Sequence, residues 1–88
     1  MYFVYILKSV KDQGYYIGYT SDLTKRLKEH NQGKTKSIKH RRPFEVFYYE
    51  KFTTKKEAKF REKQIKSWKG GEAFRKLISR VRLAMGGI

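Results

Sequence analysis

The sequence predicts a small α/β domain in which a three-stranded sheet is flanked by about three helices. Three segments rich in Tyr, Phe, Ile and Val have the composition of β-strands, and they are residues 2–8, 15–20 and 44–51. Three further segments place apolar residues at helical spacing, and they are residues 22–31, 55–66 and 72–78. A chain of 88 residues has room for one hydrophobic core of modest size.

The first two predicted strands form a hairpin. The polar segment between them ends in Gly14, which can adopt the positive φ that a connecting turn often requires. The hairpin is rich in phenols, and each hydroxyl needs a partner when it is buried. These tyrosines are Tyr2, Tyr5, Tyr15, Tyr16 and Tyr19. Their concentration is the first indication that the hairpin carries chemistry.

The helix expected over 22–31 presents one apolar face. Leu23, Leu27 and His30 lie at i, i+4 and i+7, so they share this face, and Arg26 lies on its flank. If the leucines pack on the sheet, His30 and Arg26 are drawn towards the sheet as well. Taken alone, these two side chains are typical of a half-buried histidine and of a cation that extends from the surface.

The segment from residue 32 to residue 43 is strongly basic. It contains no acidic residue and shows neither a helical nor a strand period, so it predicts a mobile loop. We expect its cations to contact phosphates, and they are Lys34, Lys36, Lys39, Arg41 and Arg42. The alternative is a basic loop that is merely solvated.

The helix expected over 55–66 opens with a capping box formed by Thr54 and Glu57. Glu62 lies on the apolar face of this helix, where a carboxylate is costly unless it is paired or bound to a cation. Two interpretations remain open at this point: an ion pair with Arg61 or another basic side chain, and a metal ligand. Beside this face runs a stripe of cations that could contact nucleic acid, formed by Lys55, Lys59, Lys63 and Lys66.

Gly70 and Gly71 end this helix, and a short helix over 72–78 follows. Residues 79–88 show no clear period, so we expect a loose C-terminal tail after a single domain that spans residues 1–78.

The charge of the chain predicts a polyanionic partner. Twenty-two Lys and Arg residues against eight Asp and Glu residues give a formal net charge of +14. Nucleic acid is the leading candidate, because a membrane-surface helix would need a stronger apolar face than any in this chain. Without cysteines, the chain cannot form disulfides or thiolate metal sites. No apolar run has the ~20 residues of a membrane span, and no export signal is recognisable, so we expect a cytoplasmic protein.

Two short motifs in the hairpin carry a family resemblance. Val4-Tyr5, followed by Tyr16-Ile17-Gly18, resembles the paired signature of the GIY-YIG nucleases. The second half is matched letter for letter, whereas in the first half Phe3-Val4-Tyr5 stands where the family has Gly-Ile-Tyr. The resemblance continues through residues 18–23, Arg26-Leu27, His30-Asn31 and Glu62. The chain is most similar to small stand-alone members and to the nuclease domains of structure-selective junction endonucleases and excision-repair nucleases.

The resemblance implies a GIY-YIG endonuclease-like fold and a role for each matched residue. Tyr5 and Tyr16 correspond to the signature tyrosines, and Arg26 to a residue that clamps phosphate. His30 is implied to lie beside the attacking water and Glu62 to hold Mg²⁺ or Mn²⁺, while Gly18 leaves room for close approach of a backbone. The implied activity is metal-dependent hydrolysis of DNA phosphodiesters, structure-selective and linked to DNA repair or recombination.

The residue types suit this chemistry. A free tyrosine titrates near ~10, so Tyr5 or Tyr16 would work as a base only if nearby cations such as His30, Arg26 or a metal lowered its pKa. Arg26 offers a planar donor fork for phosphate, and Glu62 suits one Mg²⁺ that keeps several waters.

Other functions stay open. The chain could be a catalytically inactive module that binds nucleic acid, or a basic protein associated with RNA or the ribosome. The chain has no room for a separate sequence-reading domain. Selectivity would therefore come from the shape of the DNA or from a protein partner.

Overall fold

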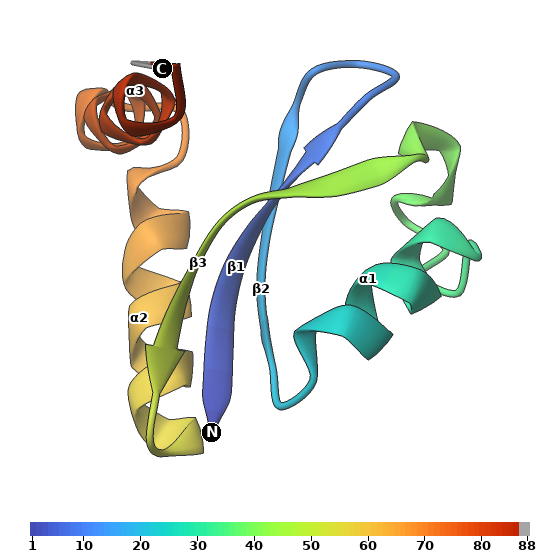
Figure 1. Cartoon of the computed structure of the whole chain (residues 1–88), viewed down its shortest axis with the longest axis horizontal. Helices are drawn as coiled ribbons and strands as arrows, with labels where there is room; N and C mark the ends of the chain where they lie inside the picture. Colours follow the sequence, from blue (N-terminus) through green and yellow to red (C-terminus); the bar gives the residue numbers. More distant parts are fainter. Residues whose placement is uncertain (87–88) are drawn as a thin grey trace.

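The computed structural model of the chain describes residues 1–86, and it confirms the predicted α/β fold (Figure 1). A three-stranded sheet stands between two groups of helices. Its elements follow the chain as β1 (Tyr2–Ser9), β2 (Tyr15–Thr20), α1 (Leu23–Asn31), the short 3-10 helix η1 (Lys39–Arg41), β3 (Phe44–Phe52), α2 (Lys55–Trp68) and α3 (Glu72–Gly86). None of the helices within residues 1–86 has both the length and the apolar composition that would be needed to cross a membrane.

The sheet has the order β2-β1-β3, and both pairings are antiparallel. The first strand is therefore central, and the other two strands form the edges. Tyr5 lies opposite Gly18 on one side and opposite Tyr49 on the other. The pairing with β3 shifts register between Ile6 and Leu7, which is the signature of a β-bulge.

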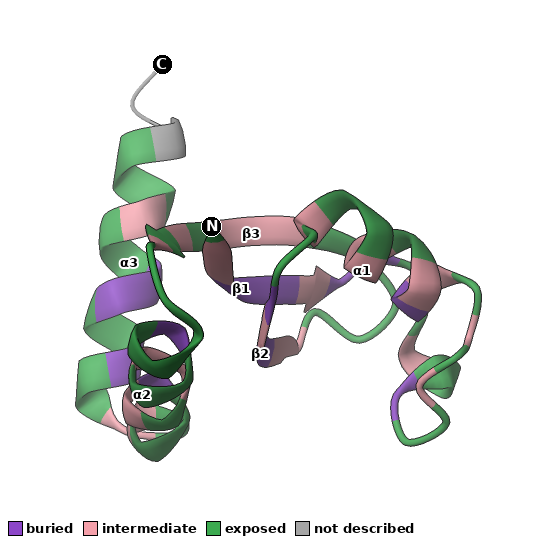
Figure 2. Cartoon of the chain, turned by 90° about the horizontal axis from the view of Figure 1, so that it is seen from below, coloured by how far each residue is buried: buried purple, intermediate pink, exposed green. Residues whose placement is uncertain are grey.

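Both faces of the sheet are covered. Alternate residues of a strand point to opposite sides, so each strand contributes side chains to both faces. Val4, Ile6 and Ile17 belong to a core cluster with buried residues of α2 and α3. Tyr5 and Leu7 point the other way and pack with Ile38 and Phe44, next to the leucines of α1. Figure 2 shows α1 on one side of the sheet and α2 and α3 on the other, with the buried residues coloured purple.

Local sequence determines where two of the helices begin and end. Asp22 caps α1 by accepting a hydrogen bond from the Lys25 amide at 3.0 Å, and Gly33 follows the helix with a φ of 79°. Such a conformation is easy for glycine and favours the end of a helix. The predicted capping box of Thr54 and Glu57 is present at the start of α2.

The last helix is longer than the sequence predicted. It was expected to end at Ile78, but α3 continues to Gly86, so residues 79–86 are helical rather than part of a loose tail. The reason is that Val81 lies at i+7 from Phe74 and extends the apolar face that packs on the core. Residues 87–88 of the predicted tail lie outside the described residues.

The basic loop over 32–43 is more ordered than the sequence predicted. Ile38 is buried in the cluster that contains Tyr5 and Phe44, and η1 follows it. The Ser9 hydroxyl also donates a hydrogen bond to the Arg41 carbonyl at 2.6 Å, which fastens the loop to the end of β1. The prediction of a segment without regular structure was therefore wrong at η1, because contacts distant in sequence hold this turn.

Candidate active site

The centre of the site is the cross-strand pair of Tyr5 and Gly18. The Tyr5 ring lies across the backbone of β2 at Gly18, and a Cβ atom built there would lie 2.6 Å from the Tyr5 Cζ atom. Real Cβ atoms do not approach other atoms so closely, so a side chain at residue 18 would displace the phenol. The glycine of the matched motif therefore has a steric reason in this fold, but the group that it accommodates is the Tyr5 ring and not the backbone that was expected.

We expect Gly18→Ala to lower the free energy of unfolding by about 1–3 kcal/mol, the usual cost of an overpacked core. Elsewhere in a strand, replacing glycine by alanine would be favourable, so the sign of the change is informative. Urea denaturation measures it. The cost should shrink when the same substitution is made in a Tyr5→Leu background, because leucine does not reach over residue 18. An equal cost in both backgrounds would show that the Tyr5 ring is not the obstacle.

His30, at the end of α1, contacts both Tyr5 and Tyr16. Its Nε2 atom lies 3.0 Å from the Tyr5 hydroxyl, and its Nδ1 atom lies 3.0 Å from the Thr35 hydroxyl. The rings of His30 and Tyr16 pack edge to face, with their centroids 5.2 Å apart. Next to it, the Asn31 side chain exchanges two hydrogen bonds with the Phe44 backbone and fixes the helix end against β3. The imidazole is thus buried with both nitrogens engaged.

The pKa values of Tyr5 and His30 both move towards the neutral form. Burial raises the pKa of Tyr5, Tyr16 adds to this, the Arg26 charge opposes it and the Glu62 charge reinforces it. Burial and the Arg26 charge lower the pKa of His30, against the smaller effect of Glu29. The condition for a tyrosine base, that nearby cations lower its pKa, is therefore not met at Tyr5 in this structure, because burial outweighs the charge of Arg26.

The lowered pKa of His30 makes the fold sensitive to acid. As the pH falls, His30 is protonated in the unfolded chain at the ordinary pKa of histidine, and only at lower pH in the folded protein. The neutral imidazole therefore costs the fold no stability at pH values above that ordinary pKa. Stability is lost as the pH falls from there through the lowered folded pKa. We expect a larger fall in melting temperature between pH 7.5 and pH 5 for the wild type than for His30→Gln. His40→Gln, at an exposed histidine, should keep the wild-type profile. A pH profile unchanged by His30→Gln would contradict this prediction.

Arg26 carries a donor that is not satisfied within the described protein. Its Nε atom is buried and has no hydrogen-bond partner in residues 1–86, and the nearest carboxylate, that of Glu29, is 3.8 Å away. The side chain lines a polar pocket of about 310 Å³ at the start of α1, together with Thr20, Asp22 and Lys25. Buried donors normally have partners, so the Arg26 guanidinium retains unused hydrogen-bonding capacity within the described residues.

Glu62 lies on α2, which packs on the opposite face of the sheet from α1. Its side chain is 18% exposed, and its Oε2 atom is 3.5 Å from the Lys66 Nζ atom. Its charge reaches the Tyr5 phenol, since it contributes to the raised pKa of that group.

The predicted alternative partner of Glu62, Arg61, is engaged elsewhere. The Arg61 guanidinium forms two hydrogen bonds with the Glu50 carboxylate, at 2.8 and 3.0 Å. An ion pair between Glu62 and Arg61 is therefore ruled out, and Lys66 is the basic partner that the structure provides. The pairing of Arg61 with Glu50 was missed because the two residues lie on different elements.

The donor set around Glu62 is compatible with one Mg²⁺ or Mn²⁺ ion. Residues 1–86 contain no group of three His, Cys, Asp or Glu side chains that could surround a metal. Mg²⁺ is commonly held by one or two carboxylates, with waters and substrate phosphates completing its shell. Glu62 is a partly exposed carboxylate whose neighbouring cation is too distant for a strong hydrogen bond, so it meets this modest requirement.

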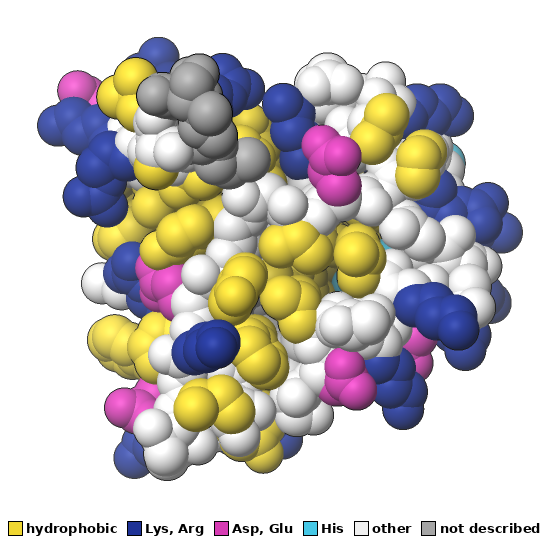
Figure 3. All heavy atoms as spheres, in the orientation of Figure 1, with side chains coloured by type: hydrophobic (Ala, Val, Ile, Leu, Met, Phe, Trp, Pro, Cys, Tyr) yellow, Lys and Arg dark blue, Asp and Glu magenta, His cyan; other side chains and the backbone are white. Residues whose placement is uncertain are grey.

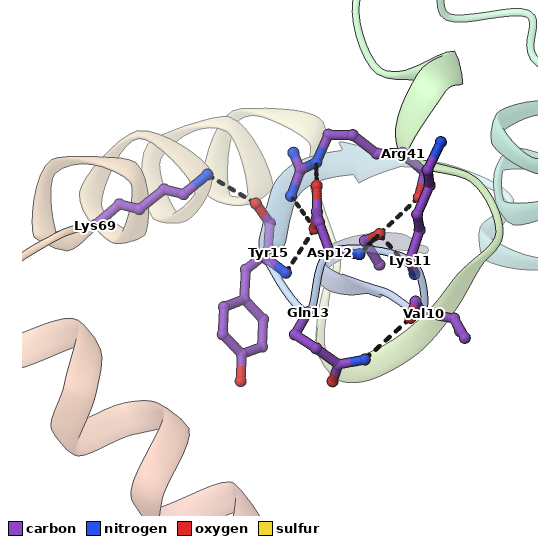
Figure 4. Close-up of polar contacts among 9 residues, drawn as sticks. Val10, Lys11, Asp12, Gln13, Tyr15, Arg41 and Lys69 are labelled. Atoms are coloured by element: carbon purple, nitrogen blue, oxygen red, sulfur yellow. Dashed lines mark hydrogen bonds and ion pairs between the residues drawn. The ribbon is translucent and has the colours of Figure 1, made fainter.

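The cations that were predicted to contact nucleic acid differ in their exposure. Exposed side chains are those of Lys34, Lys36, Lys39, Arg42, Lys55, Lys59, Lys63 and Lys66. Arg41 is different, because its Nε atom donates to Asp12 at 2.8 Å and holds the pKa of that carboxyl at about 2 (Figure 4). Figure 3 shows Lys and Arg side chains mainly around the rim of one face of the molecule.

Thr35 is the site residue that sequence reasoning missed. Nothing in the sequence distinguishes it from other loop residues, and its contact with His30 exists only because η1 and Ile38 fold the loop back onto the sheet.

Comparisons with known proteins agree with the fold and the motifs. The GIY-YIG catalytic domain matches residues 1–75. A UPF0213 protein of Bacillus pumilus is 47% identical over 68 residues, which are 76% of this chain and 68% of that protein. The UPF0213 protein YazA of Bacillus subtilis is 52% identical over 58 residues, which are 65% of this chain and 58% of that protein.

A solved structure extends the similarity to three dimensions. The solution structure of a UPF0213 protein from Bacillus halodurans has 36% sequence identity and a TM-score of 0.56, and the match covers 90% of this chain and 84% of that one. Both the sequence match and the structural match span most of the chain. The chain therefore belongs to the GIY-YIG domain family.

Proposed function

We propose that this protein is a metal-dependent endonuclease that hydrolyses phosphodiester bonds in DNA. The observation that carries the proposal is the buried Nε atom of Arg26, which has no hydrogen-bond partner within residues 1–86 and belongs to the helix that packs on the same side of the sheet as Tyr5, Tyr16 and His30. Phosphodiester hydrolysis needs a base for water and oriented positive charge for the transition state. We expect these side chains to supply both.

The raised pKa of Tyr5 suggests how the base works. A phenol that stays protonated can still accept a proton from water if it passes its own proton to His30 Nε2, which lies 3.0 Å from its oxygen. The two hydroxyl partners of His30 can accept hydrogen bonds from both nitrogens once the ring is charged. Tyr16, at the edge of the same ring, would orient the water.

The remaining roles are electrostatic. The Arg26 fork would bind two phosphate oxygens and stabilise the charge that develops on them. Glu62 would hold Mg²⁺ or Mn²⁺, and a bound divalent ion supplies Lewis-acid stabilisation of the phosphate and the leaving oxygen. The net charge of +14 and the exposed cations of the basic loop and of α2 would position the DNA. We expect selection by DNA shape or by a protein partner.

Incubation of the purified protein with plasmid, flap and junction DNA in Mg²⁺ or Mn²⁺ tests the proposal. We expect cleavage of at least one branched substrate, and its loss on addition of EDTA. Tyr5→Phe should cleave poorly while binding DNA normally, because it removes only the hydroxyl. Absence of cleavage on all three substrates with both metals would contradict the proposal.

The burial of Tyr5 favours one second candidate, a catalytically inactive module that binds nucleic acid. Only 3% of this residue is exposed, and a buried phenol bonded to histidine also suits a purely structural role. Such a module would bind DNA with strong salt dependence and would cleave under no divalent metal. The cytoplasmic location, the link to DNA repair or recombination, and RNA as an alternative ligand stay predictions.

A further inference from the structure

A second pocket, which is basic, lies on the opposite face of the sheet from His30, where the start of β2 meets α3. It has a volume of about 630 Å³. Three cations line it, Lys69, Arg75 and Arg82, together with the apolar surfaces of Tyr15 and Phe74. None of its lining residues is acidic. We call the three cations with Tyr15 the rear basic pocket.

Tyr15 holds two of these cations in place. The Lys69 ammonium donates a hydrogen bond to the Tyr15 backbone carbonyl at 2.7 Å, and Arg82 Nη2 donates to the Tyr15 hydroxyl at 3.0 Å. The Tyr15 ring is itself fixed by edge contacts with Phe47 and Phe74. Figure 4 shows the Lys69 side chain reaching Tyr15, whose ring points towards α3. Tyr15 therefore holds the charges of Lys69 and Arg82 close together.

The rear basic pocket lies near the other basic surfaces. Burial, and then the positive charges of Arg41 and Lys66, lower the pKa of Lys69, so Lys69 lies within electrostatic reach of both η1 and the lysine stripe of α2. Asp12 and Glu62 offset part of the charge of Arg41 and Lys66, whereas no acidic residue lines the pocket itself, and such a concentration of cations attracts a polyanion.

The edge strand β2 connects this pocket with the candidate active site. Tyr15 and Tyr16 are consecutive on the strand, so their side chains point to opposite faces. Tyr15 faces the rear basic pocket, and Tyr16 faces His30. Because β2 is an edge of the sheet, a ligand that passes around its open side can contact both faces.

We propose that the rear basic pocket binds the phosphodiester backbone of a second arm of branched DNA, while the first arm occupies the candidate active site. The active-site half of this inference rests on the proposed function. A straight duplex cannot follow both faces of one strand, because smooth bending over so short a length is costly. Two arms that diverge at a flap or junction can. The pocket would thus give a single small domain its preference for branched DNA.

Binding measured in EDTA, where no cleavage occurs, tests the inference. Fluorescence anisotropy over a range of salt concentrations would compare a labelled flap with a straight duplex of equal length. We expect Arg75→Ala/Arg82→Ala to lower the salt slope on the flap by about two units, since each phosphate contact contributes ~0.9. The duplex slope should stay near the wild-type value. The control Lys56→Ala/Lys76→Ala removes the same charge from exposed residues outside the pocket, and it should leave the preference for the flap intact.

The single variant Arg75→Ala distinguishes a loss of DNA binding from a loss of folding. The Arg75 side chain makes no hydrogen bond or ion pair with the rest of residues 1–86, so Arg75→Ala should melt like the wild type and lower the flap slope by about one unit. An unchanged flap slope would overturn the inference. Equal losses in the control, or on flap and duplex alike, would overturn it as well.

Two further experiments identify the ligand and distinguish this inference from the proposed function. Inorganic phosphate at constant ionic strength should not abolish the difference between the wild type and the double variant, and if it does, the pocket is a site for free phosphate. A loss of binding confined to a branched RNA would likewise overturn the assignment to DNA. A wild type that cleaves nothing, yet shows the predicted slopes, would refute the proposed function and leave the pocket standing.

Discussion

Glu62→Gln is expected to abolish cleavage while the fold and DNA binding survive. The substitution removes the carboxylate that would hold the metal, and glutamine is almost isosteric with glutamate. It breaks only the contact with Lys66, a partly exposed i,i+4 pair at 3.5 Å, and such pairs contribute about 0.3–0.5 kcal/mol. A thermal melt in EDTA should therefore change little, and cleavage assays in Mg²⁺ should show no product above background.

Glu50→Gln is the matched control for this experiment. It makes the same chemical change but breaks the paired hydrogen bonds with Arg61, which should cost about 1–3 kcal/mol because they are charge-assisted and partly buried. We expect a lower melting temperature and retained cleavage at temperatures where the variant is folded. The metal assignment would fail if Glu62→Gln kept wild-type cleavage. It would also fail if the melting temperature fell sharply while the folded fraction stayed active.

Arg26→Lys is expected to slow cleavage by on the order of a hundredfold or more, the scale for losing one oriented donor to a transition state. Lysine keeps the charge but loses the planar fork. The effect should appear in kcat rather than in KM, because the fork is expected to act on charge that develops during the reaction. Stability should hardly change, since the Nε atom has no partner in the described protein and 43% of the side chain is exposed.

Arg80→Lys makes the same exchange at an exposed position of α3, and it should leave single-turnover cleavage unchanged. Full activity in Arg26→Lys would show that Arg26 is a surface cation with no role in the reaction. A rise in KM at constant kcat would assign it to ordinary substrate binding instead.

Much of the fold was predictable because local patterns specify it. Strand composition located all three strands, and the capping box of Thr54 and Glu57 located the start of α2. The spacing of Leu23, Leu27 and His30 placed the histidine on the face of α1 that meets the sheet. Each of these signals depends on residues that are close in sequence.

Four residues of the candidate site could be named from the sequence, whereas their pKa values could not be predicted from it. Tyr5, Tyr16, Gly18 and His30 were expected to be site residues, and the structure brings them together. The pKa of Tyr5 is raised, not lowered as a tyrosine base would require, because the burial of the phenol outweighs the charge of Arg26. Burial depends on how two faces of a sheet are covered, and no single motif contains that information.

By itself, the sequence determined the types of the elements, the family resemblance and the identities of the candidate site residues. Only the tertiary structure decided the strand order, the pairing of Arg61 with Glu50 rather than Glu62, and the contact between Thr35 and His30. It also placed Tyr15 and Tyr16 on opposite faces of an edge strand, which brings a second basic pocket next to the site. The physical reason is that helical and strand patterns reflect the nearest neighbours along the chain, whereas these contacts join side chains that only the packed core brings together.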